Sequence, residues 1–193
     1  ISALGLPLAI QAVSDVRDAT FSPGTVTLLD LENADPAAFV IGEESAVAGG
    51  AAVDYVFRAC DLAMAGDVDA IVTAPLNKAA MHLAGYTYAG HTELLTERTN
   101  APRVSMLLIG PGLRIVHVST HVALSEAIAR VTPQRVEEVI QLAHDACRAL
   151  GIPEPRIAVA GLNPHASEGG IFGNEEAQSI VPAIAAARAR GLN

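Results

Sequence analysis

The chain has 193 residues, of which 51% are hydrophobic and 4% aromatic, and its formal net charge at pH 7 is −9. Arg and Lys are scattered singly, without a basic stripe to neutralise a phosphate backbone, which excludes nucleic acid as an expected partner. No apolar run approaches the roughly 18 residues of a membrane span, and two cysteines without a paired pattern fit a reducing cytoplasm, so we expect a cytoplasmic protein with no membrane partner.

Strand and helix signals alternate along the first half of the chain. The apolar runs are short, and Ser22-Pro23-Gly24 supplies a turn signal between the first two of them. Gly66 is the predicted C-cap of the longest helical pattern. Pro75 ends DAIVTA, which has the pattern of a buried strand. The predicted elements are strands at 6–13 and 25–31, a helix at 43–65, a strand at 69–74, and short helices at 77–83 and 92–99.

The second half predicts a hairpin, a long helix, one more strand and a last helix. Gly110-Pro111-Gly112 is the turn between strands at 104–109 and 113–119. The long helix runs over 133–150, with Pro at its first position and Gly just past its end. A buried strand at 156–162 then leads into a Gly-rich loop at 163–173, and a helix capped by Asn174 runs to Arg190.

This alternation predicts an α/β fold with a mostly parallel or mixed sheet and flanking helices. The helical pattern stops at Gly85-Tyr86, so we expect two α/β domains, residues 1–88 and 89–193, which meet near residues 86–92. Neither the GxGxxG nor the GxxxxGK[ST] nucleotide fingerprint is present.

Two polar segments of the first half follow strands and open helices, where α/β folds place ligands. Lys78, after the strand at 69–74, offers a positive charge to an anion, or is a solvated lysine after a turn. His91 and Thr92, after Gly90, bring an imidazole, a hydroxyl and backbone N–H groups together. They suit a phosphate or carboxylate, or Thr92 is only the N-cap of a capping box.

Two histidines of the second half follow strands in small-residue loops. His121 comes after the strand at 113–119, and His165 after the strand at 156–162. Because parallel strands end on one side of a sheet, the two imidazoles are candidates to share one metal ion. A catalytic metal generally has three protein ligands, so a pair is short by one, and the alternative is that the two histidines are unrelated.

The strings TAPLNK, YAGHTELL, STHVAL and GLNPHASEGGIFGNEE resemble, in this order, the 4-hydroxythreonine-4-phosphate dehydrogenase (PdxA) family of pyridoxal phosphate synthesis. The resemblance runs from about residue 42 to the end, and more loosely back to the start. It implies an isocitrate-dehydrogenase-like two-domain fold, of which this chain is a partial piece. It also implies that His91 and Thr92 contact substrate and that His121 and His165 bind a divalent metal. The family's third metal-binding histidine lies in a later segment that this sequence does not contain.

The resemblance further implies a reaction. The family oxidises 4-phosphooxy-L-threonine with NAD or NADP and a divalent metal (Zn, Mg, Co or Mn), and the keto product then loses CO₂. TAPLNK, YTYAGHTELL and HVSTHVAL look more like the catabolic branch, which acts on 4-phospho-D-threonate or 4-phospho-D-erythronate. Ser167 replaces the commoner Gly of NPHAGEGG, as in family members that oxidise aromatic dihydrodiols, but GHT favours a phosphorylated substrate.

Three further expectations follow. The family's enzyme is a homodimer, and the apolar strand at 104–109 with its hairpin partner is the expected contact. An inactive or purely binding fragment is the second hypothesis, because the third metal ligand is absent. A zinc hydrolase on the same two histidines is a third, but no glutamate stands in an HExxH-like arrangement.

Overall fold

The computed structural model describes residues 5–193 and has a mixed α/β architecture. Two compact units make up the chain, Ile1–Ala101 and Pro102–Asn193, and each is described by itself. Within the described residues, no helix combines the length and the apolar character needed to cross a membrane.

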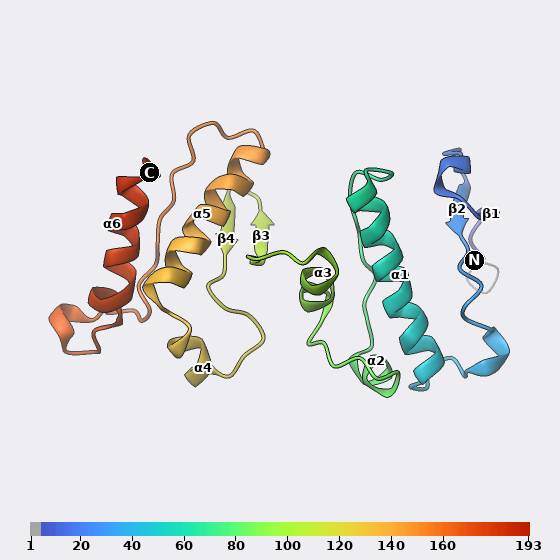
Figure 1. Cartoon of the computed structure of the whole chain (residues 1–193), viewed down its shortest axis with the longest axis horizontal. Helices are drawn as coiled ribbons and strands as arrows, with labels where there is room; N and C mark the ends of the chain where they lie inside the picture. The colour runs from blue at the N-terminus through green and yellow to red at the C-terminus, as the bar shows by residue number, and fades with distance from the viewer. Residues whose placement is uncertain (1–4) are drawn as a thin grey trace. The chain divides into compact units, whose positions relative to one another are not determined.

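The first unit combines a pair of strands with three helices (Figure 1). Strands β1 and β2 are parallel and pair from Ala9↔Thr25 to Val13↔Leu29. The strand signals of the sequence therefore fall in the right places, and the segment between them is long enough to return the chain for a parallel pairing. The elements are β1 (Ala9–Val13), a 3-10 turn (Val16–Asp18), β2 (Thr25–Leu29), a 3-10 turn (Pro36–Ala38), α1 (Ala46–Ala65), α2 (Lys78–Leu83) and α3 (His91–Thr99).

Helix α1 forms between two capping signals that the sequence displays. The Ser45 side chain accepts a hydrogen bond from the Ala48 amide at 3.4 Å, and Gly66 ends the helix in the left-handed region with φ 78°. One face of α1 lies so close to α2 that a Cβ on Gly49 would lie 2.0 Å from the carbonyl oxygen of Ala80. Only glycine permits this approach, and α1 and α2 can therefore pack backbone against backbone at this point.

Helix α3 belongs to the first unit. The buried core of this unit consists of Val53 and Val56 of α1, Met81 of α2 and Leu94 of α3. Leu94 and Met81 are both fully buried. The expected domain division between residues 88 and 89 stays a prediction. The two compact units divide after Ala101, and Leu94 of α3 packs in the core of the first unit.

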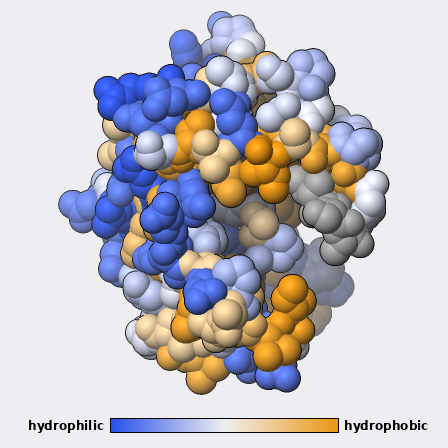
Figure 2. Space-filling view, turned by 90° about the vertical axis from the view of Figure 1, so that its right-hand side faces the viewer, coloured by the Kyte–Doolittle hydropathy of each residue, from blue (hydrophilic) through white to orange (hydrophobic). Residues whose placement is uncertain are grey.

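The β1–β2 pair leaves apolar side chains exposed. Ile10, Val26 and Leu28 are between 43% and 57% exposed. Figure 2 views the molecule from the side on which β1 and β2 lie and shows orange apolar atoms on the surface beside blue polar ones. Two strands alone seldom make a stable sheet, so this face is suited to packing against further protein.

The second unit contains a hairpin followed by helices (Figure 1). Strands β3 and β4 are antiparallel, with Leu107 opposite Val116 and Gly110 opposite Leu113, and Gly112 takes φ 75° in the turn. This confirms the predicted hairpin. The elements are β3 (Leu107–Gly110), β4 (Leu113–Val116), α4 (Leu124–Ala129), α5 (Pro133–Ala149), a 3-10 turn (Glu168–Gly170), a π-helical turn (Glu176–Ile180) and α6 (Val181–Ala189).

Helix α5 is the centre of the second unit. Thr132 caps it, accepting from the Arg135 amide at 3.2 Å, and Pro133 occupies the first turn, as the sequence predicts. Val136 and Ile140 of α5 pack against Ala183 and Ala187 of α6 to form the buried core. The small alanines of α6 allow the two helices to approach closely, so the apolar stripe of α5 is covered.

Arg135 connects the start of α5 to the hairpin. Its Nε donates to the carbonyl oxygen of Val118, and its Nη2 to that of Val104, both at 2.9 Å. Ser105 Oγ also donates to the carbonyl oxygen of His117. The segments that enter β3 and leave β4 are thereby held side by side, just before the loop that carries His121.

Two predicted strands are wrong as paired elements. Residues 69–74 and 156–162 are extended but join no sheet among the described residues, and Val72 is 97% exposed. A strand is stabilised by the ladder of a neighbour, and no described segment supplies one. The apolar pattern of 156–162 still has a role, because Ile157 and Val159 pack on the core of α5 and α6.

Two further details differ from the sequence analysis. Helix α4 is an element that the sequence does not predict, and no side chain caps its start. The last helix does not begin with a cap by Asn174; it begins with a π-helical turn that no side chain caps, and α6 continues it.

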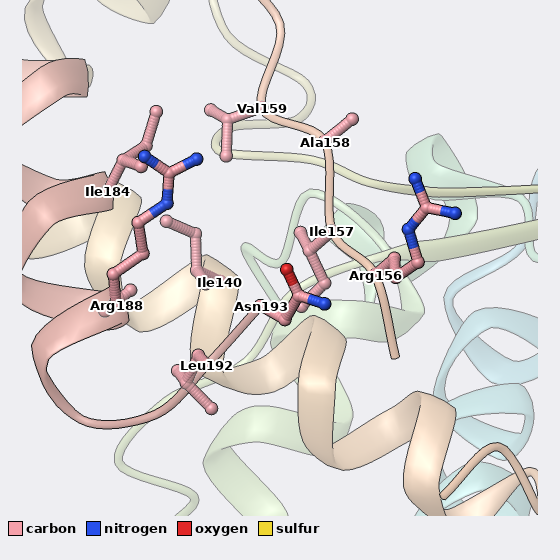
Figure 3. A pocket seen from close by; sticks show the side chains of 10 residues that line it. Ile140, Arg156, Ile157, Ala158, Val159, Ile184, Arg188, Leu192 and Asn193 are labelled. Atoms are coloured by element: carbon pink, nitrogen blue, oxygen red, sulfur yellow. The ribbon is translucent and has the colours of Figure 1, made fainter. Parts of the chain in front are cut away.

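An open groove lies between the extended segment 156–159 and helices α5 and α6 (Figure 3). Its floor is apolar, and the side chains of Arg156 and Arg188 stand at its rim, the first from the extended segment and the second from α6. None of the site residues expected from the sequence lines this groove. Its apolar lining comes from Ile140, Ile157, Val159, Ile184 and Leu192.

Candidate functional site

His165 lies in a loop whose backbone is hydrogen-bonded at two points to the side chain of Asn163. The Asn163 side-chain oxygen accepts from the His165 amide at 2.9 Å, and its Nδ2 donates to the carbonyl oxygen of Phe172 at 3.1 Å. The imidazole stacks on the Phe172 ring with centroids 4.6 Å apart, and its Nδ1 lies 3.4 Å from Glu168 Oε2. The ring is thus oriented on one face and one edge, while the side chain stays 58% exposed.

The backbone after His165 takes an unusual path. Ala166, Ser167 and Glu168 all have positive φ, at 47°, 63° and 42°. Side chains larger than hydrogen disfavour this region, so a run of three needs support from the surroundings. The glycines that follow, Gly169 and Gly170, adopt it without that cost.

Glu176 supplies part of this support from the π-helical turn. One carboxylate oxygen accepts from Ser167 Oγ at 2.7 Å, and the other accepts from the Leu162 amide at 2.9 Å. Ser167 and Glu176 are both buried. Hydrogen bonds to the charged form, first from Ser167 and then from backbone amides, hold the pKa of Glu176 below its usual range.

We expect acid to remove the stabilising contribution of Glu176. The pKa of Glu176 is lower in the folded protein than in the unfolded chain, where a Glu has a pKa of about 4.3. The stabilising contribution of Glu176 is therefore complete above the unfolded pKa and is lost as pH falls through the folded pKa. Urea unfolding of the wild type and Glu176→Gln between about pH 7 and pH 3 measures this. The difference between their free energies of unfolding should shrink toward acid; an unchanged difference would contradict the assignment.

His121 lies in the loop between β4 and α4. It is exposed and adopts φ 55°, in the left-handed region. This loop and the loop that precedes α6, which carries His165, lie toward the same end of the second unit (Figure 1). Two strands of one sheet would give this placement; here the segment before His165 joins no sheet of the described residues, although its Ile157 and Val159 pack on the same core as Val118 after β4.

Two imidazoles suit Zn²⁺ or Co²⁺ by ligand type, and suit Mn²⁺ or Mg²⁺ less well. Among residues 5–193, however, no group of three or more His, Cys, Asp or Glu side chains is placed to hold a metal ion. The described residues therefore do not make a complete metal site by themselves.

The three other expected site residues lie in the first unit, at helix starts. Lys78 is the first residue of α2, whose cap Asn77 accepts from the Ala80 amide at 2.9 Å, and its side chain is exposed. His91 and Thr92 are the first two residues of α3 and are half-buried. The capping box with Thr92 as N-cap is wrong, because Gly90 is the N-cap and no side chain caps this helix.

Helix α3 is held in place by contacts that orient its start. Arg98 donates to both carboxylate oxygens of Asp61 of α1, at 2.7 and 2.6 Å, and its guanidinium lies over the Phe57 ring. The bond from Arg98 lowers the pKa of Asp61. Such an exposed pair contributes at most about 1 kcal/mol, so the buried Leu94 contributes more to fixing α3.

Sequence reasoning missed Asn163 and Glu176. Both stand in the motif GLNPHASEGGIFGNEE, but only the structure shows that their side chains bond back to the loop of His165. A signal was available for Asn163, since Asn two residues before an unpaired backbone amide favours such a turn. None was available for Glu176, nine residues after its partner.

Comparison with known proteins places the chain in a family. The family model described as pyridoxal phosphate biosynthetic protein PdxA matches residues 2–193. The chain belongs to the PdxA family. Since the match covers almost every residue, both compact units belong to the PdxA fold.

Individual PdxA relatives are similar along nearly the whole chain. The D-threonate 4-phosphate dehydrogenase of Cupriavidus necator is 45% identical over 189 residues, 97% of this chain and 56% of that protein. The 4-hydroxythreonine-4-phosphate dehydrogenase of Beijerinckia indica is 45% identical over 195 residues, 100% of this chain and 57% of that protein. The crystal structure of the 4-hydroxythreonine-4-phosphate dehydrogenase of Klebsiella pneumoniae superposes with a TM-score of 0.90 at 43% identity, covering 98% of this chain and 59% of that one.

These PdxA proteins are longer than the chain. The chain spans a little over half the length of the relatives that it matches. The family's fold is thus assigned to these residues, while an activity of the whole protein is a matter for proposal.

Proposed function

We propose that the protein is an NAD- or NADP-dependent dehydrogenase of a small phosphorylated hydroxy acid. The observation that carries this proposal is the PdxA family match over residues 2–193, which includes every site residue expected from the sequence. Both relatives named above are dehydrogenases of four-carbon phosphorylated acids. Oxidation of a hydroxyl with transfer of hydride to a nicotinamide is the reaction class that these names share.

The first unit has the groups that suit the substrate's anionic end. His91 and Thr92 open α3, whose first amides carry no side-chain cap, and a helix start favours negative charge. Lys78 opens α2 and adds a point charge. We assign substrate binding to these three residues, with the phosphate as the group that they recognise.

The second unit supplies His121 and His165, which we assign to a divalent metal. When bound, such a metal acts as a Lewis acid on the substrate hydroxyl. Asn163 and Phe172 orient the His165 ring in this chain. Two imidazoles are one ligand short of a catalytic site, so the proposal requires a further ligand from outside the described residues.

Two substrates are candidates within this class. The first is 4-phosphooxy-L-threonine, whose oxidised product loses CO₂ on the way to pyridoxal phosphate, and the Beijerinckia relative carries the corresponding name. The second is D-threonate 4-phosphate, favoured by the equally similar Cupriavidus relative. An inactive fragment is the remaining alternative.

The test is an absorbance assay for reduced nicotinamide with the protein as it is naturally produced. NAD and NADP are each supplied with both phosphorylated acids, with added Zn²⁺, Co²⁺, Mn²⁺ or Mg²⁺. Turnover of one acid at least about tenfold faster, in kcat/KM, identifies the substrate. The unphosphorylated acids are the control, because the proposed phosphate contacts require that they react poorly. No reduction of either nucleotide with any acid or metal would reject the dehydrogenase.

We also propose a homodimer that uses the hairpin. Leu108, Leu113 and Ile115 share one face of the hairpin and are all at least 44% exposed, an apolar surface suited to a protein contact. Leu108→Arg should shift the protein from dimer to monomer in light scattering, because a buried unpaired charge is costly. Leu124→Arg, at an exposed apolar position of α4, is the matched control and should leave the dimer intact. A wild type that stays monomeric at high concentration would contradict the proposal.

A further inference from the structure

Glu176 is a buried acid that the proposed function leaves without a role. Its side chain lies on the π-helical turn, while both of its partners lie in the segment around His165. It reaches Leu162, three residues before the histidine, and Ser167, two residues after it. One carboxylate therefore accepts hydrogen bonds from residues on both sides of His165.

These two hydrogen bonds matter because the backbone that they hold is in an unfavourable conformation. Ser167 has φ 63°, a conformation in which glycine is at ease and a side chain is not. The hydroxyl that makes serine unfavourable here is the group that Glu176 binds, at 2.7 Å. The hydrogen bond from Ser167 to Glu176 thus offsets the backbone strain at Ser167. Ala166 and Glu168, on either side of this bond, also have positive φ.

Space around the anchor is also limited. A Cβ on Gly161 would lie 3.1 Å from the Cβ of Ala166 and 3.4 Å from Glu176 Oε1. The carboxylate consequently sits between the strand-like segment that ends at Leu162 and the turn that follows His165. Without it, a part-buried amide and a buried hydroxyl would lack their partner.

We propose that Glu176 is a positioning residue, which holds residues 162–168 in the left-handed path that presents the His165 imidazole. This role rests on the proposed function only in so far as His165 belongs to the active site. It acts through Ser167 and Leu162 and has no direct contact with the histidine among the hydrogen bonds of the described residues.

The first arm of the test is amide hydrogen exchange in the protein as it is naturally produced. In Glu176→Ala, exchange of residues 162–168 should rise at least tenfold, while α5 keeps its wild-type rates. Glu176→Gln keeps an acceptor oxygen for the Leu162 amide and should stay within threefold of wild type. Equal acceleration in α5 would mean a general loss of stability and would overturn the proposal, as would unchanged exchange at 162–168.

The second arm measures turnover and uses Ser167. Glu176→Ala should lower kcat about 10- to 100-fold with KM changed less than threefold, since supporting residues of a site have effects of this size. Glu176→Gln should restore most of kcat. Ser167→Ala removes one of the two bonds and should show a smaller loss, and the double variant should be no worse than Glu176→Ala alone, because both changes remove the same interaction. Additive losses, or a Glu176→Ala enzyme with wild-type kcat, would overturn the proposal.

The two arms separate this inference from the proposed function. If the wild type reduces no nicotinamide with any phosphorylated acid, the dehydrogenase assignment fails, while the exchange arm still decides whether Glu176 shapes the loop. If turnover is present and exchange at 162–168 is insensitive to residue 176, the positioning role fails and the dehydrogenase assignment stands.

Discussion

Gly49→Ala is expected to lower the free energy of unfolding by about 3 kcal/mol, the upper end of what overpacking usually costs. The new Cβ would lie 2.0 Å from the Ala80 carbonyl oxygen and 2.7 Å from the Met81 amide nitrogen, both backbone atoms that cannot rotate away. Helix α2 would have to move off α1, which would open the contact of the fully buried Met81. Denaturant unfolding with linear extrapolation measures the change.

The next residue provides the control. A Cβ on Gly50 would lie 3.6 Å from the Ala84 Cβ, an ordinary contact. Gly50→Ala should therefore stabilise the protein slightly, by about 0.5 to 1 kcal/mol, because alanine loses less conformational entropy in a helix. Equal effects of the two substitutions would show that the α1–α2 approach does not limit the side chain at residue 49.

His121→Ala and His165→Ala should each abolish detectable binding of Zn²⁺ or Co²⁺ and lower turnover by about 100-fold or more. Residues that only support metal ligands already cost about 10- to 100-fold, so loss of a ligand should cost at least as much. Calorimetric titration of the metal gives a readout that does not depend on turnover. Both histidines are exposed, so their loss should leave the unfolding midpoint nearly unchanged in the absence of metal.

His82→Ala is the matched control for the histidine variants. His82 is also exposed, and its Nε2 lies 3.3 Å from the carbonyl oxygen of Tyr88. No metal-binding role is expected for it. Its replacement should change metal affinity and turnover less than about twofold. Loss of metal binding in His82→Ala, or wild-type affinity in His121→Ala, would reject the assignment of the metal to the second unit.

Local signals predicted the helices well. Gly66 at the end of α1, and Thr132 with Pro133 at the start of α5, fix these helix ends by bonds between neighbours in sequence, so their effect can be read from the chain. The hairpin was predictable for the same reason, since Gly112 at φ 75° lies within its turn. His121 and His165 were singled out by their place after predicted strands and then by the resemblance to the PdxA family, and their roles stay predictions.

Other features depend on partners that are distant in sequence. The segment 69–74 has the apolar pattern of a buried strand, but pairing requires a neighbour, and Val72 is 97% exposed. The hydrogen bond from Ser167 to Glu176 depends on how the π-helical turn folds back over the loop of His165. The division after Ala101 likewise follows from where Leu94 packs, because periodicity shows that a face is apolar and does not show what covers it.

The two polar anchors of the second unit differ in how they respond to protons. Arg135 donates to the carbonyl oxygens of Val104 and Val118, and these backbone acceptors have no ionisable proton. Glu176 holds its loop with a carboxylate that acid neutralises. Acidification should accordingly weaken the anchor of the His165 loop before it affects the clamp on the ends of the hairpin. The two histidine loops should therefore differ in their sensitivity to acid.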